Sequence, residues 1–158
     1  MTIAHDIHAE MNPVYCAAVL AKFCEAHQQG LERKPALVTA YLVLPIALSD
    51  DLAVTFDGCN INTGLRVWIE RNPNVLLDLA ERVNSTLPVT TEAIRFGCIA
   101  KLLQIEKSGE IGSLNMKISP AILDGNSGKA FKRARLLGSW FSGTGSARAV
   151  IEAMGVSV

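Results

Sequence analysis

Charge is scarce in this chain. Charged residues make up 19% of its 158 residues and the formal net charge is zero, whereas about a quarter of the residues in ordinary soluble domains are charged. A neutral chain has no global field that would draw it to nucleic acid, so any basic site must be local. The low charge favours an exterior that a partner partly covers. The alternative is an ordinary surface over a well-filled core.

Long apolar runs are also missing. The most apolar stretch, 36–48, is shorter than the roughly 20 residues that span a bilayer, and Pro45 interrupts it. Residues 1–12 carry histidines and acids instead of a basic segment followed by an apolar one, which is not the pattern of a secretory signal. These features predict a soluble protein without a membrane partner.

The sequence contains no Cys-x-x-Cys pair. Its four cysteines are widely spaced, at Cys16, Cys24, Cys59 and Cys98. Cys16 and Cys24 fall on one helical stripe, where cysteine behaves as a small apolar residue. We therefore predict reduced, structural cysteines and a cytoplasmic protein.

The histidines do not form a metal-binding pattern. The candidate ligands are His5, His8 and His27, with Asp6 and Glu10 nearby. Most of them fall in residues 1–11, which we expect to form a flexible arm, whereas a tight metal site needs ligands that converge from rigid elements. We predict solvated side chains and no bound metal.

A catalytic or cofactor-binding centre is missing as well. Gly143-x-Gly145 lacks the Gly-Lys-Ser/Thr that completes a phosphate loop, and a turn between helices explains it. Cys24 and His27 lie one helical turn apart, a spacing at which a base could activate a thiol, although packing explains Cys24 more simply. We predict no cofactor and no catalytic residue.

Helical periodicity dominates what is present. Asn12 followed by Pro13 is a typical helix start, and Gly30 ends the apolar stripe that follows. Pro45 is expected to kink the helix 36–48 or to open its last turn. Further helices are predicted at 63–71, 73–86, 90–103 (capped by Thr90 or Thr91), 129–141 and 147–154, and two hairpin strands at 104–107 and 111–118. We expect one domain over 1–158, mainly α with a small β-hairpin.

The order helix, tight turn, helix and hairpin across 73–118 has the outline of a winged helix-turn-helix. In a DNA reader the second helix exposes basic and amide side chains to the bases. Here residues 90–103 offer only three charged side chains, Glu92, Arg95 and Lys101. A winged helix that binds protein therefore fits better, and a winged-helix DNA-binding regulator is the alternative.

A basic cluster lies near the C-terminus. Lys129, Lys132, Arg133 and Arg135 fall within two helical turns and precede Trp140. We predict that these five residues form a surface for phosphates or for an acidic partner, with Trp140 at its rim, where tryptophan often anchors a partner. The alternative is a solvated helix face with a buried tryptophan.

Five segments carry a resemblance to a known family. They are residues 12–16, 42–48, 65–73, 137–141 and 154–156, which occur in order along almost the whole chain. Together they resemble the middle components of bacterial three-component ABC systems. None of the five contains a catalytic motif.

This resemblance implies a role beside a Rad50/SMC-like ABC ATPase in a bacterial conflict system directed against phage or plasmids. In such a system the middle component is a helical, winged-helix-containing subunit that connects the ATPase to a further component. The partner hydrolyses ATP, in agreement with the missing phosphate loop here. We expect a non-enzymatic adaptor, with DNA contact inside the complex left open. A DNA-binding regulator and a small thiol-dependent enzyme using Cys24 are the alternatives.

Overall fold

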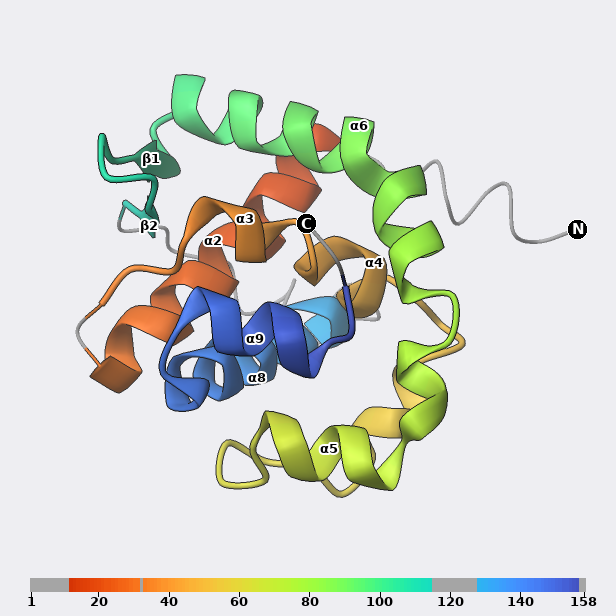
Figure 1. The fold of residues 1–158 in the computed structure, drawn as a ribbon. Helices are drawn as coiled ribbons and strands as arrows, with labels where there is room; N and C mark the ends of the chain where they lie inside the picture. Colours follow the sequence, from red (N-terminus) through yellow and green to blue (C-terminus); the bar gives the residue numbers. More distant parts are fainter. Residues whose placement is uncertain (1–11, 32, 115–127, 157–158) are drawn as a thin grey trace, which may run out of the picture.

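Three long helices organise the core. The computed structural model describes residues 12–31, 33–114 and 128–156. The long helices are α2 (Pro13–Leu31), α6 (Leu79–Ile99) and α8 (Gly128–Thr144). α2 packs against both of the others, and Figure 1 shows it in red and orange between α6 and α8. Buried side chains of all three helices join one apolar cluster, so α2 forms its centre.

α2 begins where the sequence predicts. The side-chain oxygen of Asn12 accepts a hydrogen bond from the backbone N–H of Val14 at 2.9 Å, and Pro13 is the first helical residue. Towards α8, Gly138 allows the two backbones to approach closely. A Cβ atom at Gly138 would lie 2.3 Å from the carbonyl oxygen of Phe23. The tight packing of α2 on α8 therefore requires a glycine there.

The apolar segment 36–48 forms two short helices instead of one kinked helix. They are α3 (Leu37–Ala40) and α4 (Val43–Ala47). A proline ring clashes with the carbonyl group four residues earlier, which for Pro45 belongs to Tyr41. The break consequently lies at Tyr41 and not at Pro45. Every residue of α4 is buried, so the segment is central to the core as predicted.

The prediction of two helices at 73–86 and 90–103 is wrong. After the short 3-10 helix η2 (Pro73–Leu76), a single helix, α6, runs from Leu79 to Ile99. The expected tight turn is therefore absent, and Thr90 lies within the helix instead of capping it.

Pro88 bends α6 without ending it. Figure 1 shows the helix curving around the core along its length. Pro88 and Asn84 are both exposed, so the carbonyl group of Asn84, which loses its helical donor to proline, lies on the solvent side of the helix. In the preceding turn the hydroxyl of Thr86 donates to the carbonyl oxygen of Arg82 at 3.0 Å. A proline on the outer face is tolerated there because water can replace the missing donor.

The predicted hairpin is present with shorter strands. β1 (Leu103–Ile105) and β2 (Ile111–Ser113) pair in antiparallel register, with Gln104 opposite Gly112. Gly109 adopts a φ of 88° in the connecting turn, a conformation that favours glycine.

Three further elements pack on α8. These are η1 (Ala53–Phe56), α5 (Leu65–Arg71) and the C-terminal helix α9 (Ala147–Ala153). The predicted helices at 63–71, 129–141 and 147–154 correspond to α5, α8 and α9.

The structure confirms a mainly helical fold with a two-stranded antiparallel sheet. The winged helix-turn-helix over 73–118 is not confirmed, because α6 replaces the expected helix–turn–helix. What remains of that outline is a helix followed by a hairpin. The predicted arm at 1–11 and the predicted strand end at 115–118 lie outside the described residues.

Candidate partner-binding surface

α8 carries an uneven charge. It contains Lys129, Lys132, Arg133 and Arg135 and no acidic residue. Lys129, Lys132 and Arg135 are exposed and follow each other at intervals of three residues, so they share one side of the helix. We call these three residues the basic face of α8.

The described part of the chain places no carboxylate in an ion pair with the basic face. Five other basic side chains do pair with a carboxylate: Lys22, Lys34, Arg82, Arg95 and Arg148. The basic face is therefore a local source of positive potential on a chain of zero net charge.

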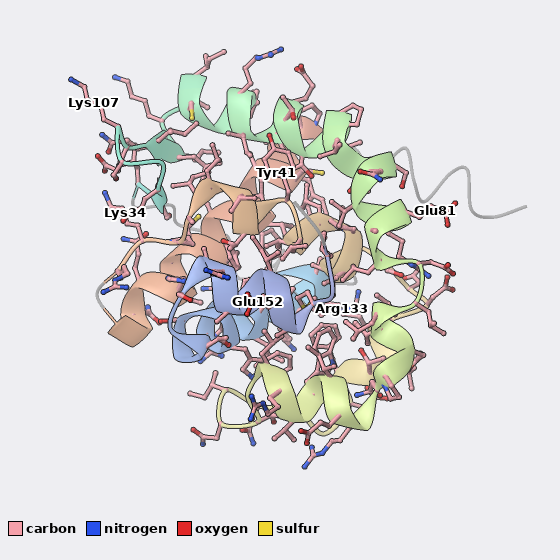
Figure 2. The ribbon with its side chains drawn as sticks, viewed as in Figure 1. Lys34, Tyr41, Glu81, Lys107, Arg133 and Glu152 are labelled. Atoms are coloured by element: carbon pink, nitrogen blue, oxygen red, sulfur yellow. The ribbon has the colours of Figure 1, made fainter. Side chains whose placement is uncertain are left out.

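Arg133 belongs to the fold more than to the basic face. Its side chain is half-buried, and its guanidinium Nη1 donates to the carbonyl oxygen of Ala47 at 2.9 Å. Ala47 is the last residue of α4, so Arg133 satisfies a carbonyl group that the helix end leaves open. Figure 2 labels this side chain.

The prediction that Trp140 lies at a rim is wrong. Trp140 is only 2% exposed, and its indole Nε1 donates to the carbonyl oxygen of Asn60 at 3.0 Å. Its ring stacks on Phe56 with ring centroids 5.9 Å apart and packs against Trp68 with centroids 5.4 Å apart. The segment that carries these partners folds over α8 from a distant part of the sequence, which local periodicity does not reveal.

A cleft of about 370 Å³ lies between α5 and the C-terminal half of α8. Its lining on the α5 side includes two exposed apolar side chains, Ile61 and Val67, together with Arg66. Ser139 and Gly143 line it from α8, and Trp140 forms part of the lining between them. We call it the α5–α8 cleft.

The α5–α8 cleft continues the basic face. Ser139 follows Arg135 by four residues, and Gly143 follows Ser139 by four more, so all three lie on one side of α8. Sequence reasoning missed the cleft because its two walls are far apart in the chain. The sequence carried no signal for it, because the pattern Gly143-x-Gly145 was explained as a turn, whereas Gly143 lies inside α8 and has no positive φ.

A comparison with family models decides the identity of the chain. Residues 2–158 match the model of the ABC-three component (ABC-3C) system Middle Component 3. This chain belongs to the Middle Component 3 family. The resemblance to middle components is thereby confirmed. Searches of curated proteins and of solved structures gave no significant match.

The Cys24–His27 pair of this middle component is not arranged as an activated thiol. Cys24 is completely buried, and burial raises the pKa of its thiol to about 12. His27 is committed elsewhere, because its Nδ1 lies 2.7 Å from the carbonyl oxygen of Arg33, to which it must donate. A thiol in this environment stays protonated at neutral pH and is a poor nucleophile.

Neither a metal cluster nor a membrane span is found in the part of the middle component that the structure describes. No group of three or more His, Cys, Asp or Glu side chains is placed to hold an ion there. His5 and His8, with Asp6 and Glu10, lie outside that part. None of its helices has the length and apolar character needed to cross a bilayer.

A second exposed feature of the middle component lies where α6 meets the hairpin. Ile99, at the end of α6, is 76% exposed, and Ile105 and Leu114 are also exposed. The backbone N–H of Leu102 donates to the carbonyl oxygen of Gly97 in α6 at 2.8 Å, and the backbone N–H of Leu114 donates to the carbonyl oxygen of Leu102 at 2.9 Å, which closes the hairpin next to the end of α6. Leu114 is opposite Leu102 in the hairpin, so its side chain lies on the other side of the sheet from that of Ile105. We call Ile99 and Ile105 the hairpin face.

The hairpin face and the basic face are on different sides of the molecule. α2 and α4 each pack against both α6 and α8. In Figure 1 the hairpin and α6 lie above α2, and α8 lies below it. One partner can therefore occupy either face without covering the other.

Proposed function

We propose that this middle component is a non-enzymatic cytoplasmic adaptor. It links a Rad50/SMC-like ABC ATPase to a further component of a bacterial conflict system that acts against phage. Membership of the Middle Component 3 family supports a role among the components of an ABC-three component system. The observation that carries the adaptor role is the basic face, whose three cations have no ion-pair partner in the described ranges.

An adaptor needs two surfaces that can be occupied together. The basic face and the hairpin face meet this need, since α2 and α4 lie between the helices that carry them. The two faces also differ in chemistry. The basic face suits an acidic partner surface, and the hairpin face suits an apolar one.

The buried Cys24 thiol supports a non-enzymatic role. A thiol-dependent enzyme would need an accessible thiolate, and Cys24 is neither exposed nor acidic. The thiol-enzyme alternative therefore has no support from this geometry.

Pairwise binding of the purified components tests the adaptor. The triple variant Lys129→Glu, Lys132→Glu, Arg135→Glu should lose one of the two pairwise interactions, and Ile99→Ser with Ile105→Ser should lose the other. Arg33→Glu, Arg71→Glu, Arg148→Glu is the matched charge control for the triple variant, because these three arginines are exposed and none of them belongs to α8, to the hairpin or to the lining of the α5–α8 cleft. The adaptor is wrong if both sets of changes abolish the same interaction, or if wild-type protein binds only one component.

The basic face also gives the DNA-binding alternative one specific observation in its favour. Cations without partners can contact phosphates, and such binding weakens steeply with salt. The same triple variant separates the two functions. If it loses duplex DNA and keeps both protein partners, the chain is a DNA-binding regulator and the adaptor proposal fails.

A further inference from the structure

We propose that the α5–α8 cleft and the basic face together form one docking surface for an acidic amphipathic helix of a partner component. Apolar side chains of that helix enter the cleft, and its carboxylates pair with the basic face. This inference rests on the proposed adaptor function and names the kind of segment that the α8 side recognises.

The cleft supplies the apolar half of the surface. Ile61 is 48% exposed and Val67 is 37% exposed, and both line the opening. Trp140 is held in the lining by its hydrogen bond to the carbonyl oxygen of Asn60 and by its packing on Phe56. A cleft lined by a fixed aromatic ring and by exposed aliphatic side chains suits an apolar side chain of a partner, which becomes buried on binding.

Gly143 lines the cleft from α8 and places no side chain in it. A Cβ atom at this position would meet nothing within 4 Å, so packing does not require a glycine. Gly143 also lacks the positive φ that requires glycine at Gly64, where φ is 81°. Glycine is unfavourable in a helix, and the fold gains nothing from it here. Because glycine has no side chain, it leaves room for the backbone of a partner to approach α8 closely at this point.

The charges around the cleft indicate that the partner segment is acidic. Arg66 lines the cleft, and Arg135 and Lys132 continue along α8 from its edge. None of these three cations forms an ion pair in the described part of the chain. Glu70 is the exposed acid on α5, and it does not line the cleft. Carboxylates on the partner would complement the three cations.

The dimensions suit a helix. Gly143 and Lys132 are 11 positions apart on α8, which is about 16 Å at about 1.5 Å per residue. A partner helix of about three turns spans the cleft and reaches both Arg135 and Lys132. Duplex DNA would use the basic face, but its bases are stacked inside the duplex and do not reach an apolar cleft, so the combination favours a protein segment.

Filling the cleft tests the inference. Gly143→Gln places a side chain into open space on a helical position, so the fold and the melting temperature should be retained. We expect this variant to weaken binding of either the purified ATPase or the purified further component at least tenfold. Ala80→Gln, an exposed helical position outside the cleft, is the matched control and should change nothing. Val67→Asp is a second cleft variant that should act in the same direction.

Peptides identify the occupant. Overlapping peptides that cover both partner components are applied to wild-type protein and to the Gly143→Gln and Arg135→Glu variants. We expect binding peptides to have an apolar stripe at helical spacing flanked by Asp or Glu, and to lose binding when those acids become Asn or Gln. Binding peptides that are basic or uncharged would overturn the inference.

The outcomes also separate this inference from the adaptor itself. If the basic-face triple variant loses a component while Gly143→Gln and Val67→Asp bind it like wild type, the adaptor stands and the docking cleft is wrong. If wild-type protein binds neither component, both are wrong. If the cleft variants weaken duplex DNA binding instead, the surface belongs to nucleic acid and the inference is overturned.

Discussion

At the scale of single residues, two tryptophans fix the segment that covers α8. The indole Nε1 of Trp68 donates to the carbonyl oxygen of Thr55 at 3.1 Å, and that of Trp140 donates to the carbonyl oxygen of Asn60 at 3.0 Å. Both rings are buried, and each packs against Phe56. The two indoles also pack against each other, with ring centroids 5.4 Å apart, and each satisfies a backbone carbonyl group of the same segment.

Both tryptophans should consequently behave as core residues. Trp68→Ala and Trp140→Ala are each expected to lower the free energy of unfolding by about 3–5 kcal/mol, as for other buried aromatic side chains. Urea unfolding of both variants checks this. A loss below about 1 kcal/mol for Trp140→Ala would contradict its place in the core.

His27 makes stability depend on pH. Burial is the main cause that lowers its pKa from the ordinary 6.5. Arg33 lowers this pKa further, while Glu110 and the hydrogen bond to the Arg33 carbonyl oppose the shift. The unfolded chain then binds a proton more readily than the folded one. The contribution of His27 to stability is complete above about pH 6.5 and is lost as the pH falls below that value.

His27→Gln tests this dependence, because glutamine can still donate to the carbonyl oxygen of Arg33 and does not titrate. Between about pH 7.5 and about pH 5.5, the free energy of unfolding should fall more steeply for the wild type than for the variant. The difference between the two curves isolates His27 from other groups. Parallel curves would show that its pKa is the same in the folded and unfolded chains.

At the scale of elements, the sequence predicts most helices because their signals are local. The cap at Asn12 depends on its own side chain, and the hairpin depends on a turn of a few residues. The continuous helix through Pro88 could not be predicted in this way. Whether a proline ends a helix depends on which side of the helix faces solvent, and tertiary packing decides that.

Gly138 in the middle of α8 and Gly143 in its last turn should respond in opposite ways to the same change. Gly138→Ala places a Cβ 2.3 Å from a backbone oxygen of α2, so it should destabilise by about 1–3 kcal/mol or more through overpacking. Gly143→Ala meets open space and should stabilise by up to about 1 kcal/mol through helix propensity. Thermal unfolding of the two variants shows whether each change raises or lowers the melting temperature. Equal effects would mean that the close approach of α2 and α8 is not real.

At the scale of the whole molecule, the candidate surface was only partly predictable. Lys129, Lys132 and Arg135 are close in sequence, so their clustering was visible, and all three are exposed in the structure. Arg133 and Trp140 have partners that come from distant elements, Ala47 and Asn60. The α5–α8 cleft exists only because α5 packs on α8. Contacts of this kind depend on the chain path and leave no local pattern.

The two faces of the molecule should differ in their response to salt. Mobile ions screen exposed charges over about 10 Å at 0.1 M salt, so binding through the basic face should weaken as salt rises. Burial of the apolar hairpin face is not screened and should be insensitive to salt or slightly strengthened by it.

Binding of each partner component across a sodium chloride series checks this difference. Raising the salt from about 0.05 M to about 0.5 M should weaken binding of the basic-face partner at least about tenfold, while binding of the hairpin-face partner stays within about threefold. In the Lys129→Glu, Lys132→Glu, Arg135→Glu variant, any residual binding of the first partner should instead strengthen as salt rises, because the glutamates repel an acidic partner and salt screens that repulsion. Equal slopes for both partners would mean that one kind of chemistry serves both interactions, and the division into a basic face and a hairpin face would be wrong.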